Sequence, residues 1–145
     1  MFNRMLPAIA LTAAVALGLA TQATAQEDEA DFAFAGDRFV AGDAPDATRN
    51  TVGDLFAAGE RVGVAGAVGE SAHLAGRKVS LTAPVGDDLY AAGMDIVIDA
   101  PVAGDAMLMG YDVTISAPVE GNLRAFGRHV VATSGIGGSL LVGAD

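Results

Sequence analysis

The sequence contains no cysteine and no tryptophan, and it has few basic residues. Without cysteine the chain can form neither disulfides nor thiolate-based catalytic or metal sites. Eight Lys and Arg residues stand against 18 Asp and Glu, which gives a formal net charge of −10. Proteins that bind nucleic acid need clustered cations against the phosphates, so we expect no nucleic-acid partner. The GK[ST] phosphate loop is also missing, so we expect no nucleotide either.

The first 25 residues have the features of a secretory signal peptide. Arg4 supplies a positive charge, and the apolar run over residues 5–20 is interrupted only by Pro7 and Thr12. Residues 23–25 (Ala-Thr-Ala) then fit the A-x-A cleavage rule. We predict cleavage after Ala25 and export to the periplasm or outside a bacterial cell. The alternative is an uncleaved membrane anchor, for which the run is short compared with a span of about 20 residues.

The rest of the sequence repeats with a period of 17 residues. The same phrase occurs at residues 79–85 (VSLTAPV), 96–102 (IVIDAPV) and 113–119 (VTISAPV). A fixed period of this length is typical of solenoids, in which each unit stacks on the next. One glycine in each unit keeps the same step: Gly42, Gly59, Gly76, Gly93, Gly110 and Gly127.

Within each unit the apolar residues alternate, as in strands with one buried face. Ile96, Ile98 and Val102 lie on one side of the chain, and Val97 and Asp99 on the other. Three such short segments, separated by turns, make up each unit. Winding them into coils about 4.8 Å apart buries all three apolar faces at once. The sequence therefore predicts an all-β, single-stranded parallel β-helix with three sides and 17 residues per coil over residues 51–145.

The short segment of each unit supports this packing. Its two inward positions exchange large and small residues from coil to coil, as stacked side chains in a narrow core require. A left-handed hexapeptide β-helix has similar spacing, but that fold has one large aliphatic residue per face, whereas Leu81, Ile98 and Ile115 add a second one here. The usual right-handed crossover between parallel strands favours a right-handed helix instead. The inward pairs are Leu55/Ala57, Ala72/Leu74, Leu89/Ala91, Ala106/Leu108, Leu123/Ala125 and Leu140/Val142.

Residues 26–50 read as an acidic lead-in and a degenerate capping coil. Residues 36–42 match residues 53–59 at the same 17-residue step, but residues 43–50 lack apolar alternation. The terminal units of solenoids are usually atypical because they shield the core. We expect Phe32 or Phe34 to lie over the open end of the core.

One column of short polar residues recurs at a corner of the coil. Asp, Ser and Asn side chains hydrogen-bond their own backbone at tight turns, and this is the role we expect for the column. A ladder of calcium ions along the carboxylates is the alternative. The column contains Asp37, Asp54, Ser71, Asp88, Asp105, Asn122 and Ser139.

No pattern of catalytic residues stands out. His73 and His129 lie more than three coils apart, so they cannot share a metal ion or form a catalytic pair. A GxSxG nucleophile elbow is missing as well. We expect no enzymatic activity, cofactor or metal. The alternative is a polysaccharide-binding or carbohydrate-processing β-helix, for which clustered acids and long loops would be needed.

The repeated phrases at residues 85–93 (VGDDLYAAG) and 119–127 (VEGNLRAFG), each followed by a V-x-I-x-A-P-V type strand, resemble the bactofilins. This family consists of polymer-forming bacterial cytoskeletal proteins, and the resemblance covers about residues 53–145 and part of the cap before them. It implies a right-handed, three-sided β-helix that assembles end to end without nucleotide as a scaffold near the cell envelope. Bactofilins act in the cytoplasm, whereas this chain carries an export signal.

Two surfaces are candidates for assembly. Leu140 and Val142 lie in the last coil, whose open strand edge predicts end-to-end self-association into a homopolymer. An outward apolar stripe predicts lateral pairing or attachment to the cell wall or a membrane surface. The stripe contains Phe56, Tyr90, Met107, Met109 and Phe126.

Overall fold

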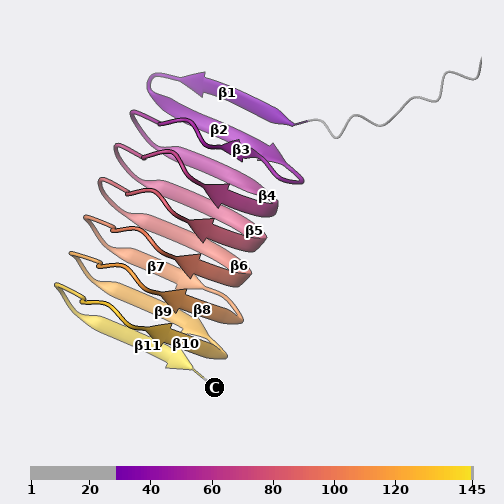
Figure 1. Cartoon of the computed structure of the whole chain (residues 1–145). Coiled ribbons are helices and arrows are strands. Elements are labelled where there is room, and N and C mark those ends of the chain that lie inside the picture. The colour runs from indigo at the N-terminus through magenta and orange to yellow at the C-terminus, as the bar shows by residue number, and fades with distance from the viewer. Residues whose placement is uncertain (1–28, 145) are drawn as a thin grey trace, which may run out of the picture.

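The computed structural model describes residues 29–144, and every regular element among them is a β-strand. Figure 1 shows the strands wound into a stack of similar coils that runs from β1 at one end to β11 at the other. The predicted signal peptide, residues 1–25, lies outside the described residues. The strands are β1 (Ala30–Phe34), β2 (Asp37–Gly42), β3 (Asp46–Ala47), β4 (Leu55–Val64), β5 (Ala72–Leu81), β6 (Leu89–Ile98), β7 (Ala106–Met109), β8 (Asp112–Ile115), β9 (Leu123–Gly127), β10 (His129–Ala132) and β11 (Leu140–Ala144).

Three parallel ladders form the three sides of the coil. The first runs through β2, β4, β5, β6, β7, β9 and β11, and the second passes from β3 through the later parts of β4–β6 to β8 and β10. The third is a row of single bridges, such as Val68 to Val85 and Val85 to Val102. Each parallel partner lies 17 residues away, so the fold is a three-sided parallel β-helix of about six turns, as the sequence predicts. The right-handed winding stays a prediction.

The alternation of inward and outward residues is confirmed. Ile98 is fully buried between Leu81 and Ile115, its partners in the adjacent coils, whereas Val97 is 37% exposed. The large and small residues of the short segment are buried as expected from Leu55 through Ala125. These side chains form one continuous core along the axis of the solenoid.

The glycine column marks the corner where the first side meets the second. A Cβ atom on Gly76 would lie 2.4 Å from the carbonyl oxygen of Gly59 in the preceding coil. Only glycine allows the backbones of adjacent coils to approach this closely. The regular 17-residue step of the glycine column therefore follows from backbone packing at the corner.

The prediction that Phe32 or Phe34 covers the core is wrong. Strand β1 pairs antiparallel with β2, and both phenylalanines are exposed. The buried guanidinium of Arg38 occupies the inward position instead, in register with Leu55. It donates bidentate hydrogen bonds of 3.0 and 2.9 Å to the carboxylate of Asp31 and a further bond to the Asp46 carbonyl. An ion pair, rather than an aromatic ring, closes this end of the core, and the Nη1 atom of Arg38 is buried without a hydrogen-bond partner among the described residues.

The corner column of polar residues also differs from its expected role. Each side chain of the column from Asp37 to Asn122 accepts a hydrogen bond from the backbone N–H of its counterpart in the next coil, not from its own turn. The Oδ1 atom of Asp88 accepts from Asp105 at 2.7 Å, and that of Asp105 accepts from Asn122 at 2.7 Å. The column therefore connects successive coils and fixes their register.

Candidate functional site

The outward face of the first ladder carries two columns of very different size. One column contains bulky side chains, which we call the ridge: Phe39, Phe56, His73, Tyr90, Met107 and Arg124. The other lies two residues further along each strand and begins with small side chains, which we call the furrow: Ala41, Ala58, Ala75 and Ala92.

Aromatic rings stack along the ridge from coil to coil. The centroids of Phe39 and Phe56 are 4.7 Å apart, those of Phe56 and His73 4.6 Å, and those of His73 and Tyr90 5.0 Å. Phe32 from β1 extends the row at 4.8 Å from Phe39. The planes of successive rings differ by 4 to 9°, so the row is straight and almost untwisted.

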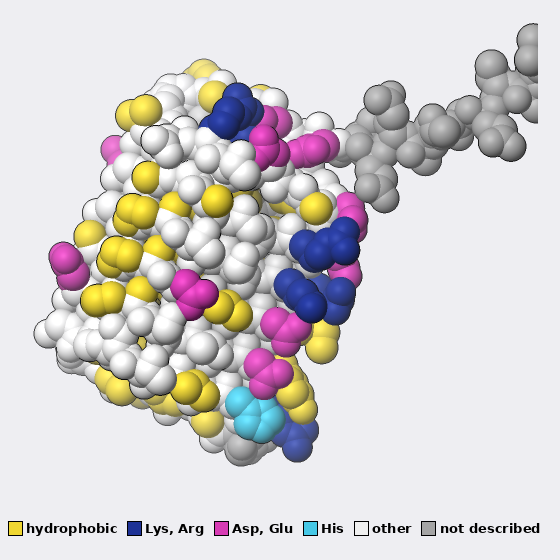
Figure 2. Space-filling view, in the orientation of Figure 1, with side chains coloured by type: hydrophobic (Ala, Val, Ile, Leu, Met, Phe, Trp, Pro, Cys, Tyr) yellow, Lys and Arg dark blue, Asp and Glu magenta, His cyan; other side chains and the backbone are white. Residues whose placement is uncertain are grey.

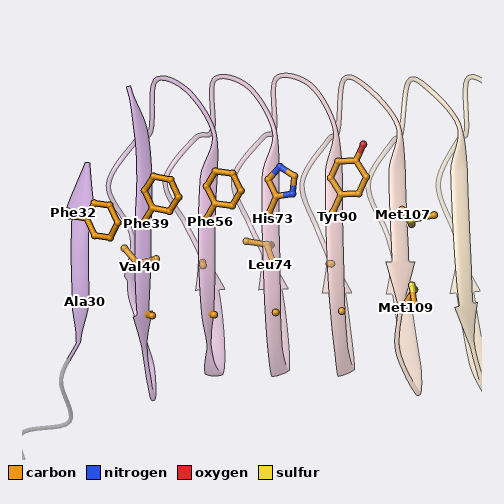
Figure 3. Close-up of a pocket in the computed structure, with 16 residues that line it drawn as sticks. Ala30, Phe32, Phe39, Val40, Phe56, His73, Leu74, Tyr90, Met107 and Met109 are labelled. Atoms are coloured by element: carbon orange, nitrogen blue, oxygen red, sulfur yellow. The ribbon is translucent and has the colours of Figure 1, made fainter. Parts of the chain in front are cut away.

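The ridge and the furrow together form an apolar groove of about 460 Å³. The rings line one side, the alanines form the floor, and Met107 and Met109 lie at its C-terminal end (Figure 3). In the view of Figure 2 the charged side chains gather toward one side of the solenoid, while apolar side chains appear over other parts of the surface. The lining of the groove contains no carboxylate and no primary amine.

The structure brings together most of the residues predicted for lateral pairing. Phe56, Tyr90, Met107 and Met109 line this single groove. Phe126 lies one coil beyond, in register with Met109, and does not line it. Sequence reasoning misplaced Phe32, because β1 runs antiparallel and its residues do not follow the 17-residue step.

The edge of the groove is acidic beside Tyr90. Its hydroxyl lies 3.4 Å from a carboxylate oxygen of Asp88, to which it can donate a hydrogen bond. The nearby charge of Asp88 raises the pKa of the Tyr90 phenol, so the ring stays neutral. The face thus offers mainly apolar contact area, with the ring nitrogens of His73 and the hydroxyl of Tyr90 as its polar atoms.

Ligands that stack on aromatic side chains need a free ring face. Phe39, Phe56 and His73 each have a ring neighbour on both faces. The groove therefore presents a continuous ridge rather than separate platforms, which gives little support to the carbohydrate-binding alternative.

The predicted end surface is apolar in the structure. Leu140 and Val142 of β11 are 55% and 42% exposed, although the equivalent residues in earlier coils are buried. Strand β11 pairs only with β9, and β10 only with β8, among the described residues. One edge of each strand thus has no β-sheet partner in this part of the chain.

The two histidines do not share a site within residues 29–144. His73 lies within the ring stack, whereas the Nδ1 atom of His129 lies 2.9 Å from Asp112 on the second side. Asp37, Asp54 and Glu70 do approach one another closely enough to hold a cation. However, Asp37 and Asp54 already accept backbone hydrogen bonds from the next coil, which accounts for their positions without an ion.

A scan against protein-family models finds no match, and searches of curated proteins and of solved structures find none either. The likeness to bactofilins therefore remains a prediction from the repeated phrases. Among residues 29–144 there is no helix long and apolar enough to span a membrane. The groove and the apolar last coil are thus the two features on which a functional assignment rests.

Proposed function

We propose that this protein is a non-enzymatic, self-assembling β-helical scaffold of the bacterial cell envelope, similar to a bactofilin but exported. Copies associate end to end along the solenoid axis. The apolar ridge and furrow provide a second surface for lateral pairing, or for attachment to the cell wall or a membrane.

The observation that carries this proposal is the exposed apolar last coil. Leu140 and Val142 are each more than 40% exposed on a strand with an unpaired edge, although they belong to the inward columns of the core. An exposed strand edge with apolar residues is a template for another chain. A second copy placed there would cover the core residues and satisfy the backbone groups together.

The opposite end of the solenoid differs in chemistry. The Arg38–Asp31 ion pair closes the core, and β1 covers the edge of β2. The outer edge of β1 still offers backbone N–H and C=O groups, since β1 pairs only with β2 among the described residues. End contacts can therefore join the last coil to β1 of the next copy, or join two last coils.

Sedimentation velocity of the purified protein tests the end contact. Leu140→Lys places a charge at the centre of the apolar end and should shift the distribution from polymers to monomers. Leu141→Lys is the matched control, because Leu141 is equally exposed on the same strand but belongs to the outward column. Equal polymer size for wild type and Leu140→Lys would contradict the proposal.

A further inference from the structure

We infer that the groove binds the same groove of a second copy, with the two solenoids side by side and pointing in the same direction. The inference rests on the proposed function and specifies its lateral contact. The ridge of each copy lies in the furrow of the other.

The sizes of the side chains support this fit. In four successive coils a large ridge residue stands beside an alanine of the furrow: Phe39/Ala41, Phe56/Ala58, His73/Ala75 and Tyr90/Ala92. A complementary partner must therefore have a large side chain opposite each alanine and a small side chain opposite each ring, at every coil. A second copy offers both at the same axial spacing, and the straight ring stack keeps the two rows aligned.

Symmetry decides the direction of the partner. A two-fold axis parallel to the solenoid, placed between ridge and furrow, puts each ridge over the partner's furrow. A two-fold axis across the solenoid, in the plane of the interface, would put ridge against ridge. Since bulky rows facing each other would hold the two faces apart, only the parallel arrangement lets them interlock.

In the C-terminal coils the furrow column carries the aromatic side chain, and the ridge column carries a flexible, charged one. Arg124 occupies the ridge position, and Phe126 replaces alanine in the furrow column. In the parallel pair the guanidinium of Arg124 faces the partner's Phe126, an arrangement that favours a cation–π contact. Between these regions, Met107 and Met109 are unbranched and can adjust to each other.

The area of the groove limits the strength of one contact. Six coils at about 4.8 Å and a width of roughly 13 Å give about 400 Å² per copy. The total of about 800 Å² is below the 1,200–2,000 Å², roughly, of stable complexes, so two isolated copies should pair only weakly. In copies joined end to end, many such contacts form along two neighbouring polymers. The overall affinity between the polymers then exceeds that of a single contact, although each contact is of the same kind.

Paired charges test this arrangement. In the parallel pair, residue 73 of one copy faces residue 75 of the other at the same coil. His73→Asp and Ala75→Lys should each weaken pairing alone, whereas an equimolar mixture should restore it through Asp–Lys contacts. Both changes are made in a Leu140→Lys chain, so that end contacts do not contribute. Circular dichroism checks that each variant folds.

Sedimentation equilibrium up to about 1 mM protein provides the measurement, since a contact of this size is expected to dissociate in the upper micromolar to millimolar range. Each single variant should lower the dimer association constant by about tenfold or more relative to the Leu140→Lys parent. The mixture should return to within about threefold of the parent. His73→Asp mixed with Thr114→Lys is the control, because Thr114 lies on the second side and cannot face residue 73.

Three outcomes would overturn the inference. They are a parent that stays monomeric throughout this range, single variants that pair as well as the parent, or a mixture that pairs no better than the Thr114→Lys control. None of them bears on the end contact, which is tested separately with the wild-type chain. If the wild-type chain forms no polymers but the mixture of charged variants pairs as expected, the proposed function is refuted and the groove contact still holds.

Discussion

Replacing one buried residue and its outward neighbour by the same amide tests the packing of the solenoid. Ile98 is fully buried in the centre of the core, and Val97 beside it is 37% exposed. Ile98→Asn removes about 2–3 kcal/mol of apolar burial. It also buries an amide without a partner, which costs about a further 1–3 kcal/mol. The sum, about 3–6 kcal/mol, is a large part of the roughly 5–15 kcal/mol that typical domains possess.

Val97→Asn should change the stability by about 1 kcal/mol or less, because the amide remains hydrated. Urea denaturation followed by circular dichroism measures both variants in the Leu140→Lys chain, which we expect not to polymerise. Ile98→Asn should unfold at much lower urea than Val97→Asn, or should not fold at all. Equal midpoints for the two variants would refute the assignment of inward and outward positions.

Further predictions concern the corners, the cap and the N-terminus. Gly63→Ala should be neutral or stabilise by about 0.4–1 kcal/mol, since its Cβ would lie 3.6 Å from Ser80 Oγ, whereas Gly76→Ala should lower the melting temperature because of the 2.4 Å approach to Gly59. Backbone and side-chain hydrogen bonds from Asn122 lower the pKa of Asp105 from its ordinary value of 3.8. The ionised carboxylate therefore stabilises the fold above pH 3.8, and this stabilisation disappears as the pH falls through the lowered pKa. Asp105→Ala should weaken that acid dependence in melting curves recorded below pH 4, and an unchanged curve would contradict the role of the column. Arg38→Met should speed hydrogen exchange in β2 while leaving β8 unaffected, and uniform exchange rates would argue against a local lid. N-terminal sequencing of exported protein should begin at Gln26, and a product that starts at Met1 would contradict cleavage.

The fold could be predicted from the sequence because a strict 17-residue step places identical environments above one another. Ile98 points inward because its partners at residues 81 and 115, one coil before and one coil after, also point inward. The same argument gives the inward and outward positions of every coil from Leu55 onward. The cap could not be predicted in this way. Strand β1 reverses direction, so Phe32 joins the outer ring stack, and a charged residue, Arg38, takes an inward position.

The polar corner column shows a second limit of sequence reasoning. Local turn chemistry suggests that Asp88 bonds its own turn, but stacking brings the N–H of Asp105 within 2.7 Å of it. The contact depends on the distance between coils, which no local pattern reveals. Most of the groove-lining residues could be predicted because both outward columns follow the repeat, whereas the depth of the groove comes from the alanine floor beside the ridge.

Negative-stain microscopy combined with fibre diffraction of the wild-type protein, prepared without nucleotide, tests the central claim most directly. The account predicts filaments whose long axis is the solenoid axis. Diffraction from aligned filaments should then show a meridional reflection at about 4.8 Å, the spacing between coils. Uniform short particles at all concentrations, or filaments with this reflection perpendicular to their axis, would contradict end-to-end assembly.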